Sequence, residues 1–212
     1  MKNTLLLKSL ALAIGLYTAS ASVVQAGVVQ EVREPEAATG YTEKQAVTAR
    51  DFMVAAANPY ATRVGYNILK KGGSAVDAAI AVQLVLTLVE PQSSGIGGGA
   101  FILHWDESQR KLTTFDGRET APKAAHSGMF LDKSGKAVSW IEAVVGGRSV
   151  GVPGVLASLK MAHDKYGRLP WKDLFQDAIN LAERGFRVSP RLQMLVEMEY
   201  NPGVTKLDPA RK

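Results

Sequence analysis

Hydrophobic and polar positions predict two helices near the start of the folded part of the chain. Between residues 58 and 71, apolar side chains recur at helical spacing after Asn58-Pro59, a pair typical of a helix start. Residues 75–89 are apolar almost all round and follow the capping-box pattern Ser74-Ala-Val-Asp77. At about fifteen residues this second helix is too short to span a bilayer, so we expect it to be buried between layers of protein.

The pattern then changes to strands and returns to helices. Residues 101–105 and 111–115 flank a polar turn and predict an antiparallel hairpin. Three more helices are expected to begin at prolines, and the first two of them to end at glycines. They run from Pro153-Gly154 to Gly167, from Pro170 to Gly185, and onward from Ser189-Pro190.

The N-terminal residues have the pattern of an export signal. Lys2 and Lys8 come before the short apolar stretch at residues 10–16, and small residues follow it up to Ala26. We expect residues 1–26 to be removed as a signal peptide, the protein to be exported to the periplasm or secreted, and no membrane association afterwards. Residues 27–48 lack any period and are expected to form a flexible mature N-terminal arm, with the folded part at residues 49–212.

Composition excludes several classes of site. The 212 residues are 46% apolar, carry a formal charge of +5 and contain no cysteine, which fits a packed globular domain without disulfides. Lysines and arginines are scattered among acids, so no nucleic-acid partner is expected. His104, His126 and His163 lack ligand spacing, so we expect no metal.

The stretch QSSGIGGGAFIL at residues 92–103 contains the spacing G-x-G-x-x-A of a dinucleotide-binding loop. Such a loop needs a strand before the glycines and a helix after them, and here the predicted order is reversed. We therefore expect no nucleotide cofactor, and a structural role in which the backbone passes close to another part of the chain. The glycines concerned are Gly95, Gly97, Gly98 and Gly99.

An arginine between two acids follows the second strand. Arg118 lies close to Asp116 and Glu119, and its planar fork suits a small carboxylate ligand. A structural ion pair with either acid accounts for the same residues equally well. The residues of this loop leave both interpretations open.

Six motifs, in collinear order, make the chain similar to the N-terminal part of the large subunit of the gamma-glutamyltranspeptidase family, also called glutathione hydrolases. They are KGGSAVDAA at 71–79, GIGGGAF at 95–101, FDGRETAP at 115–122, SVGVPG at 149–154, YGRLP at 166–170 and AERGF at 182–186. The resemblance implies an α+β fold, namely part of the four-layer αββα sandwich of hydrolases with an N-terminal nucleophile. It also implies cleavage of gamma-glutamyl amides such as glutathione, without metal or other cofactor.

The same resemblance implies roles for individual residues. Arg118 matches the arginine that binds the α-carboxylate of the glutamyl substrate, and Asp116 and Glu119 are expected to orient its loop. The family's nucleophile is a threonine exposed when a zymogen cleaves itself, and no residue of this chain matches it. We therefore expect the chain to need the remainder of the large subunit and the small subunit, and to be inactive alone. A cephalosporin or glutaryl acylase of the same family, and a non-catalytic fragment or interaction module, remain alternatives.

Overall fold

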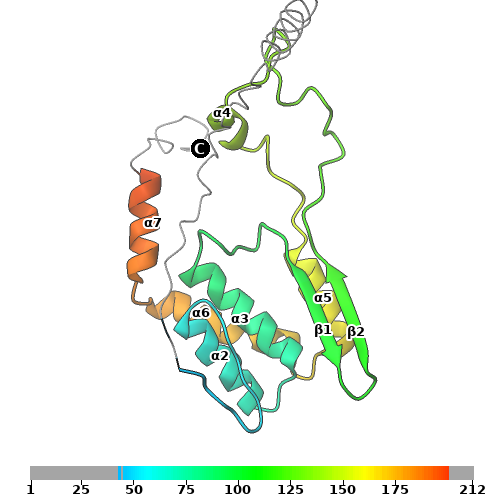
Figure 1. Ribbon diagram of the computed structural model, residues 1–212, viewed down its shortest axis with the longest axis vertical. Coiled ribbons are helices and arrows are strands. Elements are labelled where there is room, and N and C mark those ends of the chain that lie inside the picture. Colours follow the sequence, from blue (N-terminus) through cyan, green and yellow to red (C-terminus); the bar gives the residue numbers. More distant parts are fainter. Residues whose placement is uncertain (1–42, 44, 201–212) are drawn as a thin grey trace, which may run out of the picture. The chain divides into compact units, whose positions relative to one another are not determined.

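The computed structural model describes residue 43 and residues 45–200, with side chains up to residue 197. The predicted signal peptide and most of the N-terminal arm lie outside the described residues. In chain order the elements are α2 (Pro59–Lys70), α3 (Ala75–Val89), β1 (Phe101–Asp106), β2 (Lys111–Asp116), α4 (Trp140–Val144), α5 (Val155–Tyr166), the 3₁₀ helix η1 (Trp171–Phe175), α6 (Gln176–Arg184) and α7 (Pro190–Tyr200) (Figure 1).

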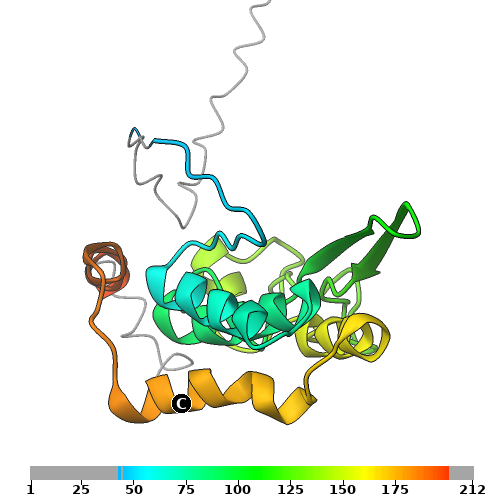
Figure 2. The ribbon, with the colours of Figure 1, turned by 90° about the horizontal axis from the view of Figure 1, so that it is seen from below.

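Helices α2 and α3 lie side by side, and η1 and α6 pack against α3 (Figure 2). The side chain of Asn58 caps α2 by accepting a hydrogen bond from the backbone of Tyr60. The predicted capping box is present at the start of α3, where Ser74 and Asp77 each accept from the other's backbone N–H. Both predicted helices are confirmed with their bounds, and the capping residues explain where each begins.

The burial expected for α3 is confirmed. Ile80 and Val85 are fully buried, and α3 contacts α2, α5, α6 and η1. Most of its apolar side chains join two hydrophobic clusters, one shared with α5 and the hairpin and one with α2. An all-round apolar helix is stable in this position because protein covers most of its surface.

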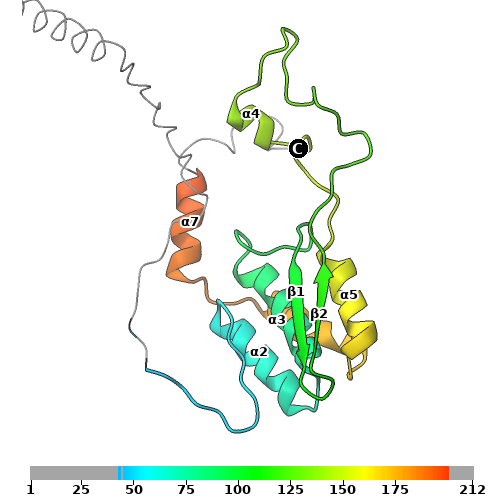
Figure 3. The ribbon, with the colours of Figure 1, turned by 45° about the vertical axis from the view of Figure 1, so that its right-hand side comes forward.

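Strands β1 and β2 form the predicted antiparallel hairpin, with Phe101 opposite Asp116 and Trp105 opposite Leu112. Helix α5 packs against it (Figure 3). These two strands make up the sheet found among the described residues. The mixture of helices and an antiparallel pair agrees with the predicted α+β class, whereas the four-layer sandwich stays a prediction.

Two elements differ from the sequence expectations. The segment after Pro170 begins as the 3₁₀ helix η1 and continues as α6, where one helix was expected. Proline at a helix start sets φ but does not select between 3₁₀ and α geometry, and η1 buries Leu174 in the core. The short helix α4 was not expected; the side chain of Ser139 caps it by accepting from the backbone of Glu142.

Candidate functional site

The loop that carries Arg118 is held by hydrogen bonds between backbone groups on both sides. Ala100 and Gly117 exchange two hydrogen bonds, at 3.2 and 2.9 Å, which extend the hairpin by one residue pair beyond the strands. On the other side, the N–H of Val152 donates to the carbonyl of Thr120 at 2.8 Å. The backbone on either side of Arg118 is therefore fixed before any ligand binds.

The glycine segment at residues 95–99 also contacts this loop and the start of α5. The carbonyl of Gly98 accepts hydrogen bonds from the N–H groups of Gly154 and Val155, both at 3.2 Å, where α5 begins. A Cβ atom on Gly99 would lie 2.6 Å from the carbonyl oxygen of Gly117, which is closer than atoms can approach. A Cβ on Gly154 would meet that same oxygen more closely still. At these two positions only hydrogen leaves room for the neighbouring backbone.

The other glycines of the segment are less constrained. A Cβ on Gly98 would lie 3.4 Å from a carboxylate oxygen of Glu119, one on Gly95 would make ordinary contact, and one on Gly97 would meet nothing within 4 Å. Helix α3 precedes the segment and β1 follows it, so the order needed for a dinucleotide loop is absent here. The structural role expected of the segment has a steric basis at Gly99 and stays a prediction for Gly95 and Gly97.

Asp116 contacts the backbone of Arg118 directly. Its Oδ1 accepts a hydrogen bond from the N–H of Arg118 at 2.9 Å, in the geometry of an Asx turn. Asp116 does not line the cavity described below. This hydrogen bond is compatible with a carboxylate that orients the loop, and that role stays a prediction.

Arg118 and Glu119 form an ion pair in which the arginine is open to solvent while Oε2 of the glutamate is buried. Nη1 of Arg118 lies 2.9 Å from Oε2 of Glu119, and the two side chains are 67% and 27% exposed. Within the part of the chain that the structure describes, Oε2 has no aligned hydrogen-bond donor. A pair of this kind contributes about 0–1 kcal/mol to stability, because water screens it and alignment is poor. The guanidinium, which is the exposed partner of the pair, is therefore accessible to a ligand carboxylate.

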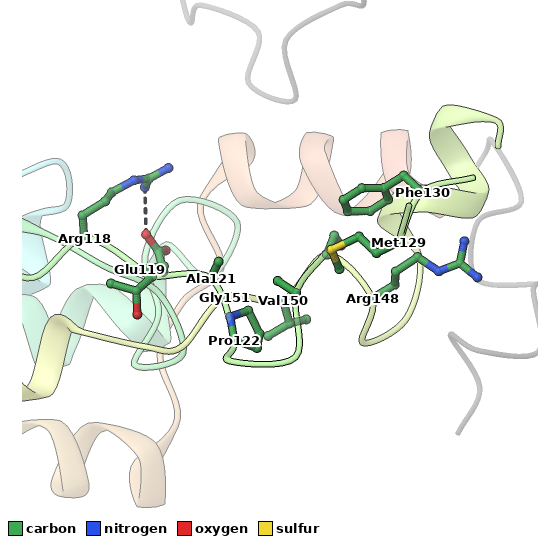
Figure 4. Close-up of a pocket in the computed structure, with 12 residues that line it drawn as sticks. Arg118, Glu119, Ala121, Pro122, Met129, Phe130, Arg148, Val150 and Gly151 are labelled. Atoms are coloured by element: carbon green, nitrogen blue, oxygen red, sulfur yellow. Dashed lines mark ion pairs between the residues drawn. The ribbon is translucent and has the colours of Figure 1, made fainter. Parts of the chain in front are cut away.

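A cavity of about 350 Å³ opens beside this ion pair. Its lining comes from residues 118–122, from Ala125, Met129 and Phe130, and from residues 148–151. Arg118 and Glu119 lie at one end, and Phe130 and Arg148 lie at the other (Figure 4). The volume is in the range of small-molecule sites, which run from about 300 to 1,000 Å³.

Arg148 was missed by the sequence reasoning. It directly precedes the SVGVPG motif at 149–154. That motif indicates the start of a helix, and nothing in it marks the residue before it as part of a ligand site. Met129 and Phe130 were missed for a different reason. They lie on the long loop between β2 and α4, and no local sequence pattern predicts the path of that loop.

Two of the three histidines, His104 and His163, and Thr113 on β2 contact aromatic side chains. The ring of His104 stacks on Tyr166 with 3.9 Å between centroids, and His163 meets Trp171 edge to face. Thr113 Oγ1 lies 2.6 Å from the Tyr166 hydroxyl, and this hydrogen bond lowers the pKa of Tyr166. Thr113 thus faces α5 and belongs to the layer between hairpin and helix.

Two kinds of feature are missing from the part of the chain that the structure describes. No three or more histidine or acidic side chains there are arranged to hold a metal ion. Among the described residues, no helix has both the length and the apolar character needed to cross a membrane.

Comparison with known proteins identifies the chain's relatives. The family model described as gamma-glutamyltranspeptidase matches residues 61–209. A glutathione hydrolase proenzyme of Bacillus subtilis is 47% identical over 145 residues, which cover 68% of this chain and 25% of that protein. The chain thus spans about a quarter of the length of the curated relatives it matches.

Solved structures agree with the sequence match. The gamma-glutamyltranspeptidase from Pseudomonas nitroreducens complexed with L-DON gives a TM-score of 0.70 at 35% identity, covering 76% of this chain and 47% of that one. The cephalosporin acylase from Bacillus halodurans gives a TM-score of 0.65 at 32% identity, covering 82% of this chain and 32% of that one. Since the family model matches well over half of the residues and the fold agrees with these structures, the chain belongs to the gamma-glutamyltranspeptidase family.

Proposed function

We propose that this chain is part of an enzyme that transfers or hydrolyses the gamma-glutamyl group of glutathione and related amides. The relatives named glutathione hydrolase proenzyme support this activity, and because the chain spans about a quarter of their length, we assign it to a longer precursor. The single observation that carries the proposal is the placement of Arg118. Its backbone is fixed on both sides, while its guanidinium is exposed beside a cavity of ligand size.

In this proposal Arg118 binds the α-carboxylate of the glutamyl group. Two parallel N–H donors of the guanidinium match the two carboxylate oxygens, and each charge-assisted hydrogen bond contributes about 1.5–3 kcal/mol. The substrate carboxylate takes the place of Glu119, whose own contact with Nη1 lacks hydrogen-bond alignment. Glu119 and Asp116 then serve to orient the loop.

The chemical step needs a nucleophile that we place outside residues 1–212. In the family chemistry that the motifs imply, precursor self-cleavage exposes a threonine whose α-amine is the base. An α-amine with a pKa of about 7.7–8.0 can accept a hydroxyl proton near neutral pH, whereas a threonine inside a chain has no such partner. We therefore expect residues 1–212 alone to be inactive, and residues 1–26 to direct export of the precursor.

The partners in this proposal are the remainder of the large subunit and the small subunit. One face of the hairpin supports their docking, because Phe101, Leu103 and Trp105 are 65%, 68% and 50% exposed on β1. A cluster of large apolar side chains of this kind is unusual on a surface that stays in water. We propose that the remaining precursor segments cover this face and complete the four-layer sandwich.

The test replaces Arg118 in the precursor. Arg118→Ala is expected to raise the KM for gamma-glutamyl-4-nitroanilide by at least about a hundredfold, because two charge-assisted hydrogen bonds of about 1.5–3 kcal/mol each are lost. Arg118→Lys keeps the positive charge but loses the planar pair of N–H donors, so its KM should lie between those of the wild type and Arg118→Ala. Self-cleavage, followed by gel electrophoresis, should be unchanged. An unaltered KM in a precursor that still cleaves itself would show that Arg118 forms only a structural ion pair and does not bind the substrate.

The acylase similarity supports a second candidate, hydrolysis of glutaryl amides. Glutaryl and gamma-glutamyl groups both end in a carboxylate that Arg118 can bind, and they differ by the α-amino group. Turnover of a gamma-glutamyl anilide and of the matching glutaryl anilide by one precursor preparation decides between the two. A preference for the glutaryl compound would favour the acylase.

A non-catalytic role is the third candidate, and the exposed face of β1 is the observation that favours it. Such a module would bind its partner without processing it. A precursor that neither cleaves itself nor turns over either anilide would support this role. Turnover of glutathione by purified residues 27–212 would contradict our placement of the nucleophile.

A further inference from the structure

A second arginine lines the same cavity as Arg118. Arg148 lies at the opposite end of the lining, beyond Met129 and Phe130 (Figure 4). Across the described residues, its side chain makes no hydrogen bond or ion pair. Arg148 thus brings an uncompensated positive charge to a cavity that already has a guanidinium at its other end.

The position of Arg148 is set by the turn on which it lies. The N–H of Val150 donates to the carbonyl of Gly147 at 3.3 Å, which closes the turn around Arg148. The hydroxyl of Ser149 donates to the carbonyl of Val144 at 3.0 Å, which ties the turn to the end of α4. The backbone of Arg148 is therefore held in place while its side chain is left without a partner.

The lining between the two arginines is mostly apolar. Met129, Phe130 and Val150 contribute to it, and Glu119 is its single acidic residue among the described lining positions. Glu119 already contacts Arg118, at 2.9 Å. Two arginines and one glutamate give the lining a net charge of +1, with a guanidinium at each end and an apolar middle. Once a ligand carboxylate takes the place of Glu119 at Arg118, this arrangement suits a ligand with two anionic groups joined by a carbon or peptide chain.

We propose that Arg148 binds a second carboxylate, on the leaving-group side of the substrate. This inference rests on the proposed function, in which Arg118 takes the α-carboxylate at the acyl end. The other end of a gamma-glutamyl amide is its amine leaving group, and in gamma-glutamyl amino acids and peptides that group carries its own carboxylate. Arg148 is then a specificity-determining residue that favours dianionic gamma-glutamyl substrates over those with a neutral leaving group.

The experiment uses two substrates that differ in one charged group, gamma-glutamylglycine and gamma-glutamylglycinamide, with the complete precursor after self-cleavage. The wild type should prefer gamma-glutamylglycine in kcat/KM. Arg148→Gln should reduce that preference by about fivefold, as expected for a partly exposed guanidinium–carboxylate contact. Lys133→Gln removes one positive charge from the segment before α4, outside the cavity lining, so it should leave the preference unchanged.

A second measurement on the wild type does not depend on any variant folding. Raising the salt concentration from about 0.05 to 0.5 M should weaken the preference, because ions screen an exposed charge pair. A preference that is independent of salt, or that is the same in Arg148→Gln as in the wild type, would overturn the inference and leave the proposed function standing. Failure of the wild type to hydrolyse either substrate would overturn the proposed function, and this inference with it.

Discussion

Two carboxylates in this protein lie in opposite environments. The side chain of Asp77, at the start of α3, is 0% exposed, and its Oδ2 accepts hydrogen bonds from three backbone N–H groups. The side chain of Glu119 is 27% exposed and contacts Arg118 without an aligned hydrogen bond. A carboxylate that accepts several backbone hydrogen bonds belongs to the scaffold, whereas one paired with a single exposed side-chain cation can lose that partner to a ligand.

The donors to Asp77 show how far its influence extends. The N–H of Ser74 lies 2.8 Å from Oδ2 and belongs to the capping box, while the N–H groups of Arg168 and Leu169 lie at 2.9 and 3.1 Å. Nε2 of His163 lies 3.7 Å from the other carboxylate oxygen. Asp77 thus joins the start of α3 to the segment that follows α5, about ninety residues later in the chain.

Asp77→Ala should give the largest loss of stability. It leaves three partly buried backbone donors without their acceptor, and each costs about 1 kcal/mol or more, so we expect a loss of about 3 kcal/mol in the free energy of unfolding. Urea denaturation followed by circular dichroism measures it. Asp77→Asn keeps an oxygen that can accept and should lose less. Equal stability of Asp77→Ala and the wild type would show that the segment after α5 is held without this carboxylate.

Gly99→Ala should have the next largest effect, because the glycine segment is the link between scaffold and site. The added Cβ would lie 2.6 Å from the carbonyl oxygen of Gly117, and the forced shift should cost about 1–3 kcal/mol. Gly97→Ala is the matched control, since its Cβ would meet nothing within 4 Å. Thermal unfolding of the two variants compares them. Similar midpoints would mean that the loop yields easily and that the close approach is not what requires glycine.

Much of the scaffold could be predicted because its signals are local. Asn58 and the Ser74–Asp77 capping box mark helix starts within a few residues, and the structure has both where the sequence places them. Asp77 also has a second role that the capping box does not reveal, because the local motif gives no sign of the two further donors in the segment that follows α5. Long-range backbone contacts of this kind leave no periodicity to read.

The site was predictable only in part, for the same reason. Arg118 stands out because two acids flank it within a short loop. Arg148 lies thirty positions later in a segment without strong periodicity, and only the path of the chain brings it to the same cavity. Sequence motifs therefore located one end of the cavity and missed the other.

Glu119→Gln should have the smallest effect on stability, and it tests most directly the difference between the Asp77 and Glu119 carboxylates. It makes the same chemical change as Asp77→Asn, one carboxylate oxygen replaced by an amide nitrogen, but at an exposed ion pair instead of a buried acceptor. We expect a change of less than about 1 kcal/mol in the free energy of unfolding, because solvent screens the contact with Arg118. Urea denaturation of both variants under one set of conditions gives the two values side by side. If Glu119→Gln lost as much stability as Asp77→Asn, the Arg118 pair would be a structural joint, and a substrate carboxylate could displace it only by weakening the loop that presents it.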